Sequence, residues 1–214
     1  MLRSISIFSG ILPIIFFCLF LRRNKEGSLW VIFLYCLISF STDALFPLHF
    51  IPGFYLYSSI TIIEYSLFSL FLYLHFKNWI FKGLLILGSA VFYFFAIFSI
   101  LHNKEQKFDS IPASVESILM IIYCIIFLYE QINDPTITFI YYTKEFWVII
   151  AFFIYFSATF FLFIYAANLT TMQHKNYWGI NMISNILNNV LFTVSFIIKQ
   201  PGRNDDPLAR PVSF

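Results

Sequence analysis

The stretch WIFKGLLILGSAVFYFFAIFSIL, residues 79–101, decides the structural class of this protein. Lys82 is its only charged residue. A helix needs about 20 apolar residues to cross the roughly 30 Å hydrocarbon core of a bilayer, and this run is long enough. A helix also satisfies its backbone hydrogen bonds within the segment, as lipid requires. The stretch therefore predicts a transmembrane helix.

The rest of the chain has the same character. Of its 214 residues, 60% are hydrophobic and 11% charged, against about 45–50% and about 25% in soluble domains. This composition excludes a water-soluble globule. It predicts one membrane domain over residues 1–199 and a polar, flexible cytoplasmic tail over residues 200–214. The runs that we expect to cross the membrane are residues 5–21, 29–50, 55–76, 79–101, 111–129, 146–169 and 178–198.

These runs predict an all-α membrane protein, a bundle of seven transmembrane helices. The runs are apolar all round, as expected for helices that face lipid and each other, whereas the strands of a membrane barrel would alternate in segments of about 10 residues. The first run has no small-residue cleavage site and is followed by Arg22 and Arg23. We therefore expect a retained helix there and not a signal peptide.

Lys and Arg are divided unequally between the two ends of the predicted helices. Nine lie at one end and four at the other, which together make the 13 of the sequence. Because positively charged loops stay in the cytoplasm, we expect the amino terminus outside and the carboxyl terminus inside. The nine are Arg22, Arg23, Lys25, Lys77, Lys82, Lys144, Lys199, Arg203 and Arg210, and the four are Arg3, Lys104, Lys107 and Lys175.

Several classes of function have no support in the sequence. The net charge of +2 is small and scattered, so no nucleic-acid partner is expected. The three cysteines lie inside apolar runs, and the four histidines lie at run ends without the spacing of a ligand set, so neither a disulfide framework nor a metal site is predicted. No nucleotide-binding or nucleophile motif is present. We therefore expect no enzyme activity and no cofactor.

Three carboxylates stand out because a mid-span Asp costs about 2.5–3.5 kcal/mol on insertion scales. They are Asp43, Glu64 and Glu116, each flanked by hydroxyl side chains. Counted at about 1.5 Å per residue, all three lie in the outer half of their predicted helices.

Two predicted helices place further polar residues on one face. Tyr57 and Thr61 share a face with Glu64, and the last run repeats the same i, i+4, i+7 spacing. The inner stretches of four runs contain no ionisable side chain other than Tyr and Cys: residues 14–21, 29–38, 119–129 and 146–154. The sequence therefore predicts a polar pocket open to the outer face and closed toward the cytoplasm. Its candidate ligand-binding residues are Asp43, Tyr57, Thr61, Glu64, Glu116, Asn181, Asn185 and Asn188.

Each of these groups also has a purely structural interpretation. Glu116 lies near a helix end, where its carboxylate can reach the lipid headgroups. Asparagines in membrane helices most often hold neighbouring helices together by hydrogen bonds. Asp43 and Glu64 lie deeper, and for them we favour a function or a required polar network.

The order of these features resembles a set of small bacterial seven-helix integral membrane proteins that accompany sensor histidine kinases. The resemblance implies a location in the bacterial inner membrane, a sensory or accessory role, and a sensor kinase as partner. The segments that carry it are residues 55–64, the SVES motif at 114–117, EFW at 145–147 with YFSATFFLF at 155–163, and residues 178–192.

Three functional hypotheses follow from the sequence. The first is a receptor-like bundle that binds a small molecule from the outer face and signals to a separate cytoplasmic partner. The second is a small-solute transporter, or a substrate-binding membrane subunit of a transport complex, although no broken helix in matched halves supports it. The third is a structural scaffold whose polar groups only pack the helices.

Overall fold

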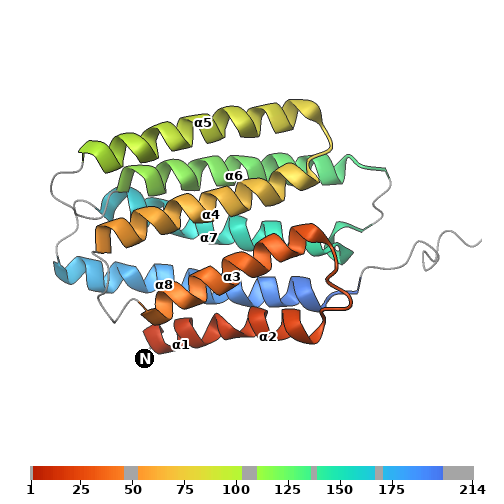
Figure 1. Ribbon diagram of the computed structural model, residues 1–214, viewed down its shortest axis with the longest axis horizontal. Helices are drawn as coiled ribbons and strands as arrows, with labels where there is room; N and C mark the ends of the chain where they lie inside the picture. The colour runs from red at the N-terminus through yellow and green to blue at the C-terminus, as the bar shows by residue number, and fades with distance from the viewer. Residues whose placement is uncertain (1, 46–52, 103–109, 136–138, 167–170, 200–214) are drawn as a thin grey trace, which may run out of the picture.

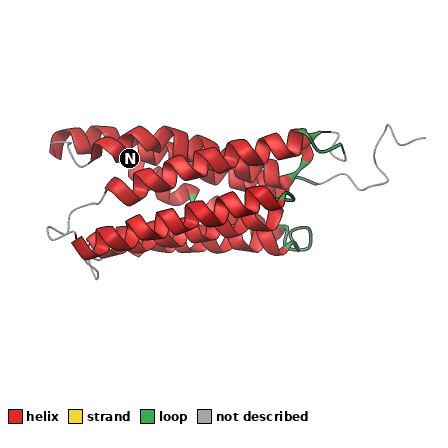
Figure 2. Ribbon diagram, turned by 90° about the horizontal axis from the view of Figure 1, so that it is seen from above, coloured by secondary structure: helices red, strands yellow, loops and turns green. Residues whose placement is uncertain are grey.

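The structure, a computed structural model, describes residues 2–45, 53–102, 110–135, 139–166 and 171–199. Helices account for nearly all of them, and the described residues contain no strand (Figures 1 and 2). The predicted tail at residues 200–214 lies outside the described residues. The elements are α1 (Leu2–Ser9), α2 (Ile11–Leu19), α3 (Gly27–Leu45), α4 (Gly53–His75), α5 (Trp79–His102), α6 (Ser110–Ile132), the short 3-10 helix η2 (Ile140–Tyr142), α7 (Lys144–Ala166) and α8 (Thr171–Ile197).

The predicted all-helical class is confirmed within this described part of the chain. Six of its helical segments are long and apolar enough to cross a membrane, which fits a multi-pass integral membrane protein. α4 is not among the six, although it lies in the same bundle; it carries Glu64 and several hydroxyl side chains. The count of seven spans and the direction of the chain across the membrane stay predictions. The six are Leu2–Leu19, Gly27–Ala44, Trp79–His102, Ile111–Ile132, Lys144–Leu162 and Trp178–Ile197.

The first predicted helix is interrupted, because α1 ends at Ser9 and α2 begins at Ile11. Pro13 has no N–H to donate to the carbonyl of Ser9 four residues earlier, and its ring crowds that carbonyl. At the break, the N–H of Gly10 donates to the carbonyl of Ile7 at 3.1 Å, which forms a tight turn. The last helix differs in the other direction: α8 begins at Thr171, about two turns before the predicted start at 178.

The helices run alongside one another and place their connections at two ends of the bundle (Figure 1). α7 packs against both α6 and α8, while α5 packs against α4 and α6 at one edge. The outer side of α5 has no protein neighbour among the described helices, and its apolar side chains fit contact with lipid. Its most exposed members are Trp79, Ile80, Leu87, Phe94 and Leu101.

Aromatic rings fill the centre of the bundle. Phe68 of α4 lies 3.9 Å from Phe152 of α7, measured between ring centroids, and Phe152 meets Phe192 of α8 at 5.6 Å. Nearer the other end, Phe17 of α2 meets Phe196 of α8 at 5.0 Å. All five rings are fully buried. They form a continuous apolar core beneath the polar region described next.

α5 and α6 approach one another at a glycine. A Cβ added to Gly88 would lie 1.9 Å from Oη of Tyr123, a distance that real Cβ atoms do not show. Glycine is therefore required here by close approach to the neighbouring side chain. The Tyr123 hydroxyl lies over α5 and donates to the carbonyl of Leu85 at 3.5 Å.

Candidate functional site

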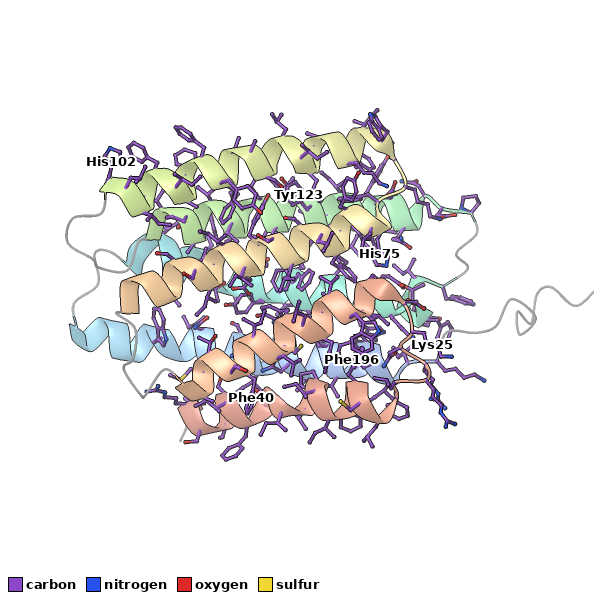
Figure 3. The ribbon with its side chains drawn as sticks, in the orientation of Figure 1. Lys25, Phe40, His75, His102, Tyr123 and Phe196 are labelled. Atoms are coloured by element: carbon purple, nitrogen blue, oxygen red, sulfur yellow. The ribbon has the colours of Figure 1, made fainter. Side chains whose placement is uncertain are left out.

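A cavity of about 270 Å³ lies at the end of the bundle that holds the start of α1, on the left of Figure 1. We call this the cavity end, and the opposite end, with the α2–α3 loop and Lys25 (Figure 3), the basic end. Six helices contribute to the cavity wall: α1, α3, α4, α6, α7 and α8. The residues that line it are Arg3, Ser6, Ile7, Tyr35, Ile38, Ser39, Thr42, Asp43, Ile60, Thr61, Ile63, Glu64, Ala113, Glu116, Tyr155, Phe156, Trp178, Asn181, Met182 and Asn185.

Six of the eight candidate residues line this one cavity. They are Asp43, Thr61, Glu64, Glu116, Asn181 and Asn185. The backbone of Tyr57 belongs to α4, but its side chain lies outside the described part of the structure. Asn188 does not line the cavity. It is 1% exposed, and neither polar atom of its amide has a hydrogen-bond partner among the described residues.

Glu64 is held by a hydroxyl group from the neighbouring helix. The Tyr35 hydroxyl of α3 donates to Oε1 of Glu64 at 3.0 Å, and both residues are buried. Glu64 also lies close enough to Asp43 and to Glu116 for their charges to interact. The wall of the cavity therefore concentrates acidic groups, which repel one another when they are ionised.

Glu116 is the most deeply buried of the three carboxylates, at 2% exposure. Its Oε1 has no hydrogen-bond partner within the described part of the chain, and neither has the buried Oδ1 of Asn181, which lines the same cavity. A buried polar atom without a partner costs about 1–3 kcal/mol, and more when it is charged. The structural interpretation in which Glu116 reaches lipid headgroups does not describe this position, because the side chain faces the interior.

Asn185 both lines the cavity and holds helices together. Its Nδ2 donates to Oγ of Ser6 in α1 at 3.3 Å, and its amide lies near the carboxylate of Asp43. One turn further along α8, Nδ2 of Asn189 donates to Oγ of Ser9 at 2.9 Å. Helix packing, the structural interpretation of these asparagines, is therefore part of what they do.

Several polar or aromatic groups of the cavity were not predicted from the sequence, among them Arg3, Tyr35 and Tyr155. Arg3 lies near enough to Asp43 for their opposite charges to attract. A signal for Tyr35 was present, because Tyr35, Ser39 and Thr42 follow the same i, i+4, i+7 spacing that marked α4 and α8. No such signal marks Arg3 or Tyr155.

A second polar cluster, which the sequence analysis did not predict, lies at the basic end. Lys144 is 3% exposed, and its Nζ donates to the carbonyl of Arg23 at 2.8 Å and lies 4.0 Å from Oε1 of Glu26. Nε2 of His75 lies 3.6 Å from Oε1 of Glu145. Burial raises the pKa of Glu26, and the nearby carboxylate of Glu145 raises it further. The cluster ties the α2–α3 loop to the ends of α4 and α7.

No metal centre is formed by the described residues, since they contain no group of three or more His, Cys, Asp and Glu side chains arranged to hold an ion.

No protein-family model matches the chain, and neither a curated protein nor a solved structure has significant similarity to it.

Proposed function

We propose that this chain is a receptor-like membrane protein that binds a small molecule in the cavity and signals to a separate cytoplasmic partner. The observation that carries the proposal is the cavity itself, with polar side chains from six helices gathered at one end of an otherwise apolar bundle. Polar side chains are costly to bury inside a membrane, and ionisable ones that occur there usually mark a functional site.

The position of the aromatic core supports a receptor more than a channel or a carrier. A conduction path needs polar groups along its whole length. Below the cavity, the centre of the bundle is occupied by Phe68, Phe152 and Phe192, which are fully buried. A ligand in the cavity would thus be closed off from the basic end.

A route for the signal is offered by α8. Asn181 and Asn185 line the cavity near the middle of α8, while the carbonyl of Phe196 at its carboxyl end accepts a 3.2 Å hydrogen bond from Nδ2 of Asn24. A ligand that shifts α8 would therefore act on the α2–α3 loop at the basic end, where we propose that a partner such as a sensor kinase docks in a bacterial inner membrane. Such a shift requires that the ligand bind one arrangement of α8 better than another.

A transporter is the second candidate, favoured by one observation. The break between α1 and α2 at Gly10 lies one turn from Ser6, which lines the cavity, and interrupted helices are frequent at transporter binding sites. A carrier must expose the cavity to both faces in turn, whereas a receptor needs access from one face only.

Cysteine accessibility separates these two functions without knowledge of the ligand. Thr61 lines the cavity, so Thr61→Cys is prepared in a variant whose native cysteines, Cys18, Cys36 and Cys124, are replaced by alanine. The probe is a membrane-impermeant cationic thiosulfonate, applied to right-side-out and to inverted membrane vesicles. The receptor predicts labelling from the outer face alone, and labelling from both faces would favour the carrier.

The control for this experiment is Ile97→Cys in the same background. Ile97 is 56% exposed on α5, away from the cavity and on a side that we expect to contact lipid, so a charged reagent should not label it from either face. A scaffold that binds nothing predicts a cavity closed to the reagent, and absence of Thr61→Cys labelling in both preparations would overturn the proposed function.

A further inference from the structure

We infer that the cavity binds the protonated amino group of a small primary amine, placed between Glu116 and Asn181. This inference rests on the proposed function, because it names the class of ligand that the same cavity would take. Two polar atoms of the wall support it, because neither has a hydrogen-bond partner among the described residues.

Both of these atoms are hydrogen-bond acceptors. Oε1 of Glu116 and Oδ1 of Asn181 are buried and have no donor among the described residues, although both side chains line the cavity. A ligand that satisfies them must supply hydrogen-bond donors. A primary ammonium group has three donors and no acceptor, so it fits two acceptors and a neighbouring carboxylate better than a hydroxyl group with one donor.

The charge of the cavity also favours a cation. Asp43, Glu64 and Glu116 contribute three carboxylates to the wall, against the single guanidinium of Arg3. Arg3 lies near Asp43, and Glu64 already accepts from the Tyr35 hydroxyl. Glu116 is therefore the carboxylate that gains most from a cationic partner, because an ionised carboxylate is stable in a buried site only when it is paired.

The other residues of the cavity wall indicate the chemistry of the rest of the ligand. Phe156, Tyr155 and Trp178 bring aromatic rings to the same cavity, and aromatic faces attract cations as well as apolar groups. The volume of about 270 Å³ lies just below the roughly 300–1,000 Å³ of ordinary small-molecule sites. The ligand is thus a small amine with a compact apolar body.

The same ammonium chemistry is carried by a free amine and by the headgroup of phosphatidylethanolamine. The test therefore uses purified protein in nanodiscs of phosphatidylglycerol alone, which contain no amine. Phenethylamine, its trimethylammonium derivative, 2-phenylethanol and 3-phenylpropanoate are titrated as soluble probes, and nanodiscs with added phosphatidylethanolamine form the lipid arm. Thermal shift and tryptophan fluorescence report binding, since Trp178 lines the cavity.

We expect phenethylamine to bind at least about tenfold more tightly than the trimethylammonium, alcohol and carboxylate probes, because only it supplies three N–H donors at a charged group. Glu116→Gln should weaken the binding of phenethylamine by about tenfold to a hundredfold. Asn181→Leu should also weaken this binding, and it serves as a second test if Glu116→Gln folds poorly. Glu130→Gln is the matched control, because Glu130 caps backbone N–H groups of Lys77 and Asn78 far from the cavity. Stabilisation by phosphatidylethanolamine that Glu116→Gln removes would identify the lipid as the source of the amine.

Three results would overturn the inference. The first is tighter binding of the alcohol or the carboxylate than of the amine, which leaves the proposed ligand-binding function intact but changes the ligand class. The second is amine binding that persists unchanged in both Glu116→Gln and Asn181→Leu. The third is the absence of binding by both amine sources while Thr61→Cys is labelled from the outer face, since the accessible cavity would then take another class of ligand.

Discussion

A single hydroxyl group, that of Tyr35, satisfies a carboxylate inside the bundle. Its bond to Glu64 joins α3 to α4, and both side chains are buried. The acidic residue was visible in the sequence as an unusual charge in an apolar run. Its partner was one of 13 tyrosines; the spacing of Tyr35, Ser39 and Thr42 marks a polar face of α3, but only the packing of the helices shows that this face meets Glu64.

Tyr35→Phe should lower the stability of the protein. The substitution keeps the ring but leaves Oε1 of Glu64 without its donor, which costs about 1–3 kcal/mol. Thermal unfolding in detergent measures the effect. Tyr129→Phe is the matched control, because Tyr129 is 62% exposed, and an equal change in melting temperature for the two variants would contradict the assignment.

Gly88→Ala should also be destabilising, by about 1–3 kcal/mol, because overpacking forces neighbouring groups to move. The added methyl group would meet Oη of Tyr123 at 1.9 Å. Removal of that oxygen in Gly88→Ala/Tyr123→Phe should restore much of the lost stability. Gly83→Ala in the same helix has nothing within 4 Å of the new Cβ and should lose no stability; a loss equal to that of Gly88→Ala would refute this explanation.

At the scale of helices, α1 and α8 are joined by polar contacts as well as apolar ones. Ser6 and Ser9 lie on the same side of α1, three residues apart, and receive hydrogen bonds from Asn185 and Asn189. The asparagine spacing in α8 is therefore matched by a serine spacing in α1. This pairing attaches the short first helix to the wall of the cavity.

A double-mutant cycle on Ser9→Ala and Asn189→Ala should reveal a coupling of about 0.6 kcal/mol, and at most about 1.7 kcal/mol, as found for hydrogen bonds between membrane helices. The measurement is the unfolding free energy of the two single variants and the double variant. The effects of Asn133→Ala and Ser9→Ala on the unfolding free energy should be additive, because Asn133 is exposed and its side chain donates to the carbonyl of Tyr129 in the last turn of α6. If the effects of Ser9→Ala and Asn189→Ala on the unfolding free energy are additive, the hydrogen bond between them contributes nothing to stability.

The cluster at the basic end makes stability depend on pH through Glu26. Burial and the carboxylate of Glu145 raise the pKa of Glu26 above its ordinary value of 4.5, while Lys144 and His75 oppose this shift. The folded state therefore binds more protons than the unfolded state just above this value, and stability falls as the pH rises through that range.

Glu26→Gln removes this contribution. The variant should melt at a higher temperature than the wild type at about pH 7.5 and at an equal temperature at about pH 3.5, where Glu26 is protonated in both states. Lys25→Gln changes the charge of the neighbouring exposed residue and should show no such dependence. A Glu26→Gln variant that is less stable at the higher pH would show that the pairing of Glu26 with Lys144 outweighs its burial.

At the scale of the molecule, the bundle has a polar cavity at one end and a basic surface at the other. His102 lies at the cavity end and Lys25 at the basic end (Figure 3). The unequal division of Lys and Arg in the sequence predicts that the basic end faces the cytoplasm.

This orientation is tested with His102→Cys and Lys25→Cys, each in the background without native cysteines. Both native side chains are exposed. A membrane-impermeant maleimide added to intact spheroplasts should label His102→Cys, and Lys25→Cys should react only after the membrane is permeabilised. The reverse pattern would place the cavity on the cytoplasmic side and would remove the basis for an extracellular ligand.

The sequence by itself determined the helical class and most of the helix positions, because apolar runs of membrane length allow few alternatives for a backbone that must satisfy its own hydrogen bonds. It also identified Asp43, Glu64 and Glu116, because a carboxylate in such a run is rare and costly. The break at Gly10 was missed, although Pro13 was visible, since composition alone does not show how a proline-containing helix adjusts to its neighbours.

Only the tertiary structure decided which polar residues share a cavity. Helical spacing relates residues within one helix, but it does not fix the rotation of one helix against another. That rotation brings Tyr35 to Glu64 and Asn185 to Ser6, and it leaves Asn188 outside the cavity. It also buries Lys144 near Glu26 at the other end. These contacts depend on packing between residues distant in the chain, which no pattern within a single run records.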